Sequence, residues 1–215
     1  WGLTKMQCPQ AWDLHTGTSD VIVTTIDTGC TLDHPDLEAN IRVNPGEDLN
    51  GNGVWDPSDN NDVDDDGNGF VDDLVGWDFV SGQPGSGEIP SEDYGPRDNM
   101  VYPDIHGHGT HVMGTAAGVT NNNTGVASAS WNVKAMPLRA GYAWEWFGSL
   151  YGSGYSDDFA EAINYAVNNG SRVISISFGG SSFNGFYDDA VNYARANNVL
   201  IFASAGNNNN SSYVY

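Results

Sequence analysis

The stretch Gly107-His108-Gly109-Thr110-His111-Val112-Met113-Gly114-Thr115 decides how the rest of this chain is interpreted. Its first histidine, His108, opens a run of small residues that reaches Gly118, and this composition predicts a helix packed tightly on all sides. A lone histidine in such a place is more often a satisfied core residue than a chemical group. His108 is not alone, because polar residues at the ends of predicted strands would lie beside it.

Two apolar runs that predict buried strands each deliver a polar side chain. The β-branched run at residues 21–26 ends in Asp27, and the apolar run at residues 199–205 leads to Asn207. The carboxyl ends of parallel strands meet at one edge of an open α/β sheet, and ligand sites lie there. A carboxylate, an imidazole and an amide at that edge predict an acyl-transfer site made of Asp27, His108 and Asn207.

Strands and helices alternate in the second half of the chain. Apolar runs predict strands at residues 133–139, 173–177 and 199–205. One helix is predicted to begin with Ser156 as its N-cap and to end at Gly170, and another is predicted near residues 186–197. Repeated strand–helix–strand units imply a parallel sheet with right-handed connections. The predicted fold class is therefore α/β, with a doubly wound parallel sheet.

The charge of the chain limits its partners. Its 215 residues hold 28 acidic and 7 basic side chains, which gives a formal net charge of −21 and a pI of about 4.1. Such a chain is not expected to bind nucleic acid or an anionic membrane, and cations are its natural partners. No apolar run is long enough to predict a membrane span, and the start at Trp1 is typical of a mature or trimmed chain.

Residues 44–103 differ in composition from the rest of the chain. They hold 15 of the 28 acidic residues and one basic residue, Arg97, and so supply −14 of the net charge of −21. Within them a spacing of alternate oxygen-bearing side chains followed by glycine occurs twice, as in the first half of an EF-hand-type calcium loop. The predicted calcium ligands of the two loops are Asp48, Asn50, Asn52, Asp64, Asp66 and Asn68.

Neither loop clearly completes the EF-hand pattern. The twelfth position is Asp59 in the first loop and Val75 in the second. We therefore expect calcium loops without full EF-hand helices, carried by an insertion at about residues 44–103. The alternative is a solvated acidic loop without bound cations. Repetition of the spacing, and the self-repulsion of so many carboxylates in one segment, favour calcium.

Five motifs in a fixed order give the chain a family resemblance. They are Asp27-Thr28-Gly29, His34-Pro35-Asp36-Leu37, the stretch at 107–115, Ser177-Phe178-Gly179-Gly180 and Ala205-Gly206-Asn207. Together they resemble the subtilisin-like serine proteases, in which Asp precedes His along the chain. The resemblance implies that Asp27 orients His108, that His108 acts as general base and then general acid, and that Asn207 donates a hydrogen bond to the oxyanion.

The resemblance also implies where substrate and a calcium ion are held. An extended peptide would lie between two walls, made of Gly152, Ser153 and Gly154 and of Ser177, Phe178 and Gly179. A structural calcium ion would be held by Asp36, Asn122, Thr124 and Val126. For the neighbouring aromatic residues a core position is favoured, with the edge of a cleft as the alternative; these residues are Trp144, Trp146, Tyr151 and Tyr155.

The nucleophile of the family lies in a Gly-Thr-Ser-Met/Leu-Ala motif after the oxyanion asparagine, and no such motif follows Asn207 here. We therefore expect residues 1–215 to be the N-terminal part of a secreted serine endopeptidase domain, with a sheet incomplete at its C-terminal end. The serine would come from a C-terminal companion segment or chain, the substrate would be a protein or peptide, and calcium would be the cofactor. The alternative is a non-enzymatic calcium-binding module or an inactive protease of the same fold. Cys8 and Cys30 either form a disulfide or remain free thiols.

Overall fold

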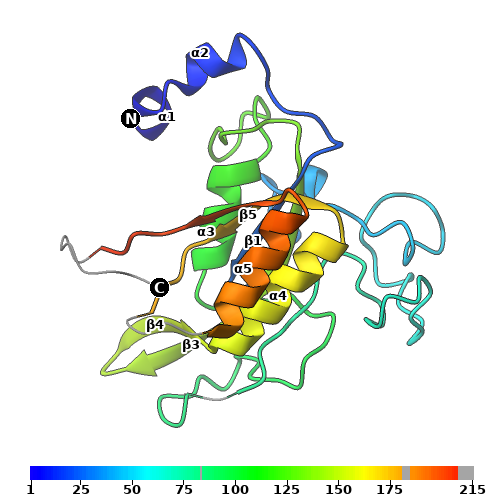
Figure 1. The fold of residues 1–215 in the computed structure, drawn as a ribbon, viewed down its shortest axis with the longest axis vertical. Coiled ribbons are helices and arrows are strands. Elements are labelled where there is room, and N and C mark those ends of the chain that lie inside the picture. Colours follow the sequence, from blue (N-terminus) through cyan, green and yellow to red (C-terminus); the bar gives the residue numbers. More distant parts are fainter. Residues whose placement is uncertain (83, 181–184, 208–215) are drawn as a thin grey trace.

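The computed structural model describes residues 1–82, 84–180 and 185–207, and a parallel sheet organises them (Figure 1). Four strands lie in the order β2-β1-β5-β6. Their bounds are Ile22–Asp27 for β1, Lys134–Arg139 for β2, Ser171–Ile176 for β5 and Leu200–Ala203 for β6. All pairings between them are parallel, so the four carboxyl ends share one edge of the sheet. The predicted fold class is confirmed.

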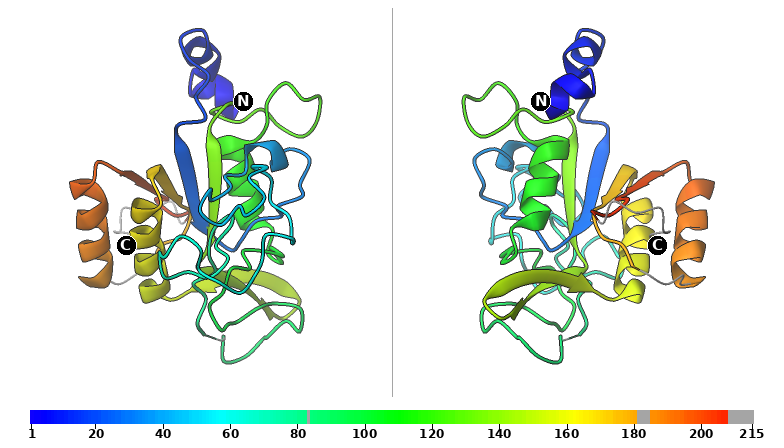
Figure 2. Two further views of the ribbon diagram at one scale, coloured as in Figure 1. Left: turned by 90° about the vertical axis from the view of Figure 1, so that its right-hand side faces the viewer. Right: turned by 90° about the vertical axis from the view of Figure 1, so that its left-hand side faces the viewer.

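Helices cover both faces of this sheet, as the two side views in Figure 2 show. On one face, α4 (Ser156–Asn168) and α5 (Gly185–Ala196) pack against β1, β2 and β5 through a cluster that includes Phe159, Ile163 and Ile174. On the other face lies α3 (His108–Ala117), whose Met113 and Ala117 are fully buried against the opposite side of β1 and β2. Small residues in α3 permit this close packing on the face that carries Gly109, Met113 and Ala117. The prediction of a helix packed on all sides is wrong, because His111 and Thr115 are exposed.

Two predicted boundaries need correction. Ser156 is the first residue of α4 rather than its N-cap, and Tyr155 occupies the N-cap position without a side-chain capping bond. The strand predicted at 199–205 is shorter and less buried than expected, because β6 is an edge strand of the described sheet. Leu200 and Phe202 on β6 are 60% and 59% exposed.

The acidic segment connects η1 (Glu38–Asn40) to α3 without any further helix or ladder strand in its described residues. Isolated bridges tie it to the sheet, since Ile41 pairs with Ala135 and Asp78 pairs with Arg139, and a further bridge joins Asp78 to Asp98 within the segment. Its apolar residues enter both cores, with Val75 on the α3 side and Phe79 on the α4 side. The segment is therefore packed onto the domain, in the looped path visible in Figure 1.

Two short helices precede the first strand of the sheet, and a hairpin separates β2 from α4. Helices α1 (Gly2–Lys5) and α2 (Cys8–Trp12) lie at one end of the molecule, far from the hairpin of β3 (Gly141–Trp146) and β4 (Ser149–Gly154) in Figure 1. Cys8 and Cys30 are both buried free thiols, so no disulfide joins them. No described helix is both long and apolar enough to span a bilayer.

The hairpin corrects the favoured core position of its aromatic residues. Trp146, Tyr151 and Tyr155 are between 42% and 49% exposed, and Trp144 is half-buried. Trp144, Trp146 and Tyr151 lie on an antiparallel pair of strands outside the parallel sheet, and Tyr155 lies at the N-cap position of α4. Trp144 and Trp146 line a hollow on the hairpin, which agrees with the alternative of a position at the edge of a cleft.

Candidate active site and acidic clusters

Asp27 and His108 meet at the carboxyl edge of the sheet. Asp27 is the last residue of β1, and His108 is the first residue of α3. The His108 Nδ1 atom lies 2.7 Å from Asp27 Oδ1, with the carboxylate 1% exposed and the imidazole 40% exposed. A carboxylate acceptor holds the proton on Nδ1, so Nε2 is the nitrogen that can accept another proton.

The start of α3 is held by a residue that the sequence analysis missed. Asp104 Oδ1 accepts hydrogen bonds from Thr28 Oγ1 and the Gly107 amide, and its Oδ2 accepts bonds from the amide and hydroxyl of Thr110. These bonds occupy amide groups at the start of α3, which lack partners within a helix. Asp104 thereby connects the turn after β1 to the first turn of α3 and positions His108. An Asp a few residues before a predicted helix was the available signal.

Glycine allows the helix to approach the strand closely enough for this pair. A Cβ atom on Gly109 would lie 2.2 Å from the carbonyl oxygen of Gly29, so no larger residue fits without displacing the backbone. The Gly109 amide donates to Thr28 Oγ1 at 3.0 Å. Gly107 has φ of 77°, a conformation that favours glycine. The glycines on both sides of His108 are therefore required by geometry.

Asp27 is fully buried. Burial raises the pKa of the Asp27 carboxyl above its ordinary value, while hydrogen bonds from His108 and the Thr28 amide counteract this effect in part. Asp27 Oδ1 receives these donors, at 2.7 Å from His108 and 2.8 Å from Thr28. The ionised form is thus held chiefly by the imidazole that it orients. A buried carboxylate beside a half-exposed imidazole is suited to stabilise an imidazolium ion.

The two predicted walls of the substrate groove lie close to this pair. Phe178 follows β5 and its ring centroid is 6.1 Å from that of His108 and 5.0 Å from that of Phe159. A Cβ atom on Gly152 would be 3.5 Å from both Phe178 Cζ and the ring of His106, which places β4 against the same ring. Ser177 is half-buried and Gly179 is exposed beside Phe178.

Asn207 lies beyond β6 and is exposed. Because β6 is parallel to β1, Asn207 follows the sheet edge that carries Asp27. No hydrogen bond joins Asn207 to Asp27 or His108, all three of which belong to the described residues. The structure therefore brings Asp27 and His108 into contact and leaves Asn207 as a neighbour along the same edge.

Asp36 is hydrogen-bonded to two other residues of the predicted structural calcium site. It is 2% exposed, and it accepts hydrogen bonds from the Asn122 side-chain amide and from the Val126 backbone amide, both at 2.8 Å. Thr124 is exposed and donates its amide to Asn122 Oδ1. Asp36, Asn122 and Val126 thus come together, whereas Thr124 is linked to them only through Asn122.

The two predicted calcium loops share one hydrogen-bonding scheme. In the first, Asp48 accepts the amides of Asn52 and Gly53; in the second, Asp64 accepts those of Asn68 and Gly69. Asn50 and Asp66 also match, because each accepts the amide two residues ahead. The spacing repeat is therefore a structural repeat. Asp59 at the twelfth position of the first loop is buried and accepts the side-chain amide of Asn50 at 2.9 Å.

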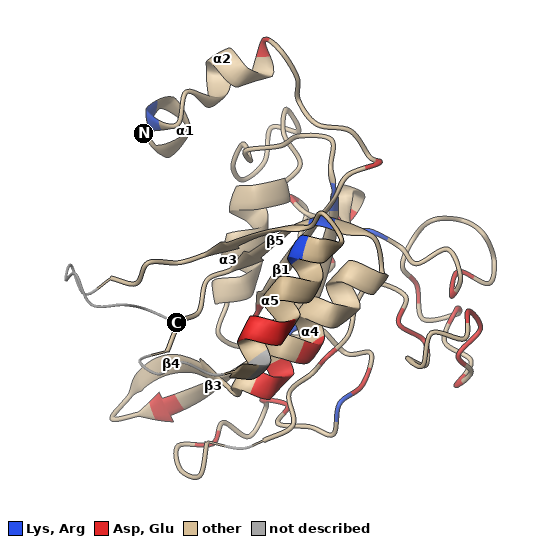
Figure 3. Ribbon diagram, viewed as in Figure 1, with Lys and Arg blue, Asp and Glu red and all other residues tan. Residues whose placement is uncertain are grey.

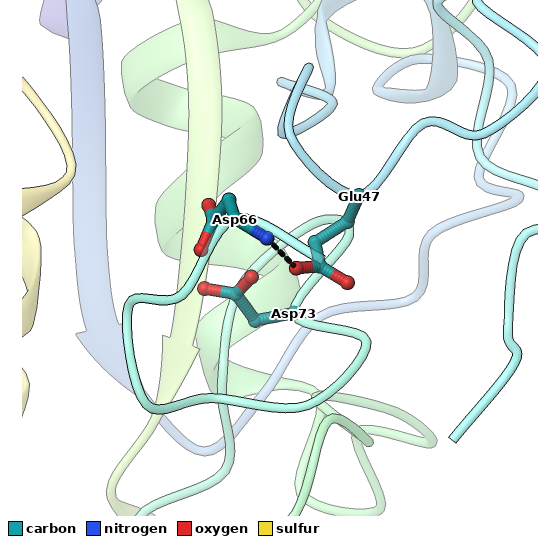
Figure 4. Close-up of side chains that lie close together, drawn as sticks. All are labelled: Glu47, Asp66 and Asp73. Carbon is teal, nitrogen blue, oxygen red and sulfur yellow. Dashed lines mark hydrogen bonds between the residues drawn. The ribbon is translucent and has the colours of Figure 1, made fainter. Parts of the chain in front are cut away.

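The second loop forms a cluster with two carboxylates that the sequence analysis missed. Glu47, Asp66 and Asp73 each offer an oxygen within 4.8 Å of the others. Figure 4 shows the three side chains converging. Glu47 and Asp73 are fully buried, and Glu47 Oε2 has no hydrogen-bond partner. Burial raises the pKa values of both carboxyls. Glu47 lies outside the repeated spacing, although the Asp72-Asp73 pair just after the loop was a visible signal.

A different acidic cluster in the same segment contains an arginine. Arg139 at the end of β2 is 1% exposed and forms ion pairs with Asp78 and with Glu92, the latter at 2.5 Å. Asp78 also shares a cluster with Asp93 and Asp98. Burial raises the pKa of Asp78 to about 7 against the attraction of Arg139. We assign no metal ion to this cluster because Arg139 already supplies its positive charge.

A doubly wound sheet with an Asp–His pair at its carboxyl edge defines a class of α/β protein with acyl-transfer geometry. The subtilase family model matches residues 18–215, and the chain belongs to this family. The resemblance stated from the five motifs is therefore confirmed.

Similar proteins agree with this assignment. Thermitase of Thermoactinomyces vulgaris is 31% identical over 215 residues, which are 100% of this chain and 57% of thermitase. Halolysin of Haloferax mediterranei is 32% identical over 98% of this chain and 31% of its own length. Among solved structures, sphericase matches with a TM-score of 0.59 at 28% identity, covering 91% of this chain and 48% of sphericase. The chain thus spans about half the length, or less, of these relatives.

Proposed function

We propose that this chain supplies the acid–base part of a serine endopeptidase. The observation that carries the proposal is the 2.7 Å contact between His108 Nδ1 and Asp27 Oδ1 at the sheet edge. His108 Nε2 would take the proton of a serine hydroxyl as its oxygen attacks the peptide carbonyl, and would then give that proton to the leaving amine. Asp27 would stabilise the imidazolium ion, and the side chain of Asn207 would donate to the oxyanion.

The serine would be contributed by residues beyond Tyr215 or by a companion chain. Exposed Leu200 and Phe202 on β6 support this proposal, because an edge strand with two exposed apolar side chains offers a surface for additional structure. The relatives named above are longer than this chain, which agrees with the same arrangement.

Peptide substrate would bind between β4 and the segment after β5. Gly152 and Gly154 on one wall, and Ser177 to Gly179 on the other, offer backbone groups to an extended peptide. Phe178 would border the pocket for the residue before the scissile bond. Such an environment favours apolar side chains at that position.

Calcium would hold the acidic segment and the loop at Asp36. The fully buried Glu47 carboxylate with an unpartnered oxygen supports the proposal, because a buried anion without a cation is unfavourable. Glu47, Asp66 and Asp73 would provide the hard oxygen ligands that calcium prefers, and Asp64, a ligand expected from the spacing, would be a further one. The ion would supply structural charge balance rather than chemistry. A calcium-rich extracellular location agrees with this requirement and with the net charge of −21.

The test uses the full-length protein that contains these residues, with calcium present. A fluorophosphonate probe should label one serine, and peptide cleavage should fall by about 10⁴-fold or more in Asp27→Asn and His108→Ala. His111→Ala is the matched control, because His111 is exposed on the same helix one turn away, and it should retain native activity. Cleavage that survives His108→Ala, or an active preparation without any serine adduct, would sink the proposal and favour the non-enzymatic calcium-binding alternative.

A further inference from the structure

The β3–β4 hairpin has two faces of different composition. Residues directly opposite one another in an antiparallel pair share a face. Ala143 pairs with Gly152, and Gly141 pairs with Gly154, so small residues occupy the part of one face that contacts Phe178 and His106. The pair of Glu145 and Leu150 lies on the same face, nearer the turn. The other face carries the larger side chains, in the cross-strand pairs Tyr142 with Ser153, Trp144 with Tyr151 and Trp146 with Ser149.

The free edge of β4 follows from the contacts of β3. The amide of Ala143 donates to Glu92 and its carbonyl accepts the Tyr94 hydroxyl, so both groups point away from β4. Ala143 and Gly152 therefore form a non-hydrogen-bonded pair, and Gly152 directs its own amide and carbonyl to the open edge of β4. The same alternation applies to Gly154. A peptide added along this edge would pair with Gly152 and Gly154.

The side chains of such a peptide would alternate between the two faces. Residues opposite Gly152 and Gly154 would face Phe178. The residue between them, level with Ser153, would face the aromatic side of the hairpin. On that side lies a hollow of about 320 Å³ lined by Pro84, Ser86, Tyr142, Trp144, Trp146 and Ser153.

The hollow has a defined aromatic wall. Trp144 Nε1 donates to Ser153 Oγ at 2.9 Å, which fixes the indole beside the strand that carries the free edge. Trp144 stacks on Tyr151 at 5.0 Å and lies 6.5 Å from Trp146, between ring centroids. The Glu145 amide donates to the Gly87 carbonyl, so the segment with Ser86 is tied to β3. The hollow thus has aromatic walls joined to the free edge by Ser153.

We propose that this hollow is an additional substrate subsite that accepts one bulky apolar or aromatic side chain, from the peptide residue level with Ser153. The proposal rests on the proposed peptidase function. If the proposal holds, the aromatic face of the hairpin determines specificity for the peptide residue level with Ser153. The two adjacent peptide residues instead contact the face of the hairpin near Phe178. Alternation along the peptide is its distinctive consequence.

The test is a positional scan with the full-length enzyme in calcium. Each of the four residues before the scissile bond is varied in turn among Gly, Leu, Phe, Glu and Arg within one otherwise constant peptide. We expect that, at one of the four positions, peptides with Phe or Leu have a kcat/KM about ten-fold higher than the peptide with Gly. This is the low end of the discrimination that a hydrophobic pocket gives. In Trp146→Ala that preference should fall at least three-fold, mainly through KM, while preferences at the two adjacent positions stay unchanged.

The control is Leu14→Ala, because Leu14 is 87% exposed and does not line the hollow. It should leave every preference as in the native enzyme. Two results overturn the subsite but not the peptidase. In the first, the peptides are cleaved but Trp146→Ala alters no side-chain preference. In the second, Trp146→Ala changes the preferences at adjacent positions equally. A preference for Arg or Glu at this position overturns it as well. Failure to cleave any peptide overturns the proposed function and the subsite together.

Discussion

Two groups of carboxylates in the acidic segment, each with fully buried members, are balanced in different ways. At the sheet edge, Arg139 pairs with Asp78 and Glu92. Nearby, Glu47, Asp66 and Asp73 converge, yet none of the ion pairs among the described residues connects them to Lys or Arg. We call these groups the arginine cluster and the open cluster. Figure 3 shows that acidic positions are numerous along the segment and that basic positions are few.

Under the proposal that calcium binds the open cluster, the difference separates what the chain stabilises by itself from what depends on an external cation. The arginine cluster attaches residues 78–98 to β2 beside Asp27, since Asp27 and Arg139 are paired in the sheet register. It also reaches the hairpin, because Glu92 accepts the Ala143 amide. The open cluster instead joins only parts of the segment and Tyr165 of α4, whose hydroxyl donates to Asp73. Folding of the site edge should thus be independent of calcium, whereas order at residues 47–73 should depend on it.

The largest expected effect comes from removal of the internal cation. Arg139→Met should lower the free energy of unfolding by about 3–5 kcal/mol, because Asp78 and Glu92 would remain buried without a counter-charge. Urea denaturation in excess calcium measures this change. Arg195→Met provides the same side-chain replacement at an exposed position of α5 and should cost less than about 0.5 kcal/mol. A cost below about 1 kcal/mol for Arg139→Met would contradict the distinction between the clusters.

Calcium removal should have the next largest effect and should act on the other cluster. Calcium at a hundred times its dissociation constant would stabilise the fold by about 2.7 kcal/mol, so chelation should lower the melting temperature by roughly 5–10 °C. Limited proteolysis in chelator should cut between residues 48 and 73 before it cuts between 84 and 98. An unchanged melt, or cleavage first at the residues held by Arg139, would show that the clusters do not differ as described.

A substitution within the open cluster should have opposite effects on stability with and without calcium. Glu47→Gln removes a buried carboxylate whose Oε2 has no partner. In calcium the variant should bind the ion at least about ten-fold more weakly, whereas in chelator it should be more stable than the native chain by about 1 kcal/mol. Calcium titration and melting curves with and without chelator measure both effects.

Asp65→Asn is the matched control for this sign change. Asp65 is exposed beside Asp66 and bonds only to the Asn61 side-chain amide through its own carboxylate. It should alter neither calcium affinity nor stability by more than about 0.5 kcal/mol. Destabilisation by Glu47→Gln in chelator as large as in calcium would mean that Glu47 acts through protein contacts alone.

These contrasts also show how far sequence patterns reach. Asp27 and His108 could be paired in advance, because strand ends and a helix start place them at one sheet edge. Glu47 and Asp73 could not, because their convergence depends on how a segment without regular secondary structure folds back on itself. Arg139 was visible as the end of a strand, but its partners lie 47 to 61 residues away. Long-range polar contacts carry no periodicity in the sequence. The class of site could therefore be predicted better than the buried polar residues that hold the surrounding segment in place.

The smallest expected effect concerns an ion pair at the surface. Arg97 pairs with fully buried Asp158 and also with Glu161, which is 53% exposed. Glu161→Gln should change the free energy of unfolding by less than about 0.5 kcal/mol, because water and salt screen an exposed pair. Glu38→Gln makes the same charge change at an exposed residue of η1 and serves as the control. Thermal melts of both variants at low and high salt should coincide within error. If Glu161→Gln instead cost as much as Arg139→Met, the number of ion pairs rather than their burial would govern the stability of the segment, and the contrast between the two clusters would lose its physical basis.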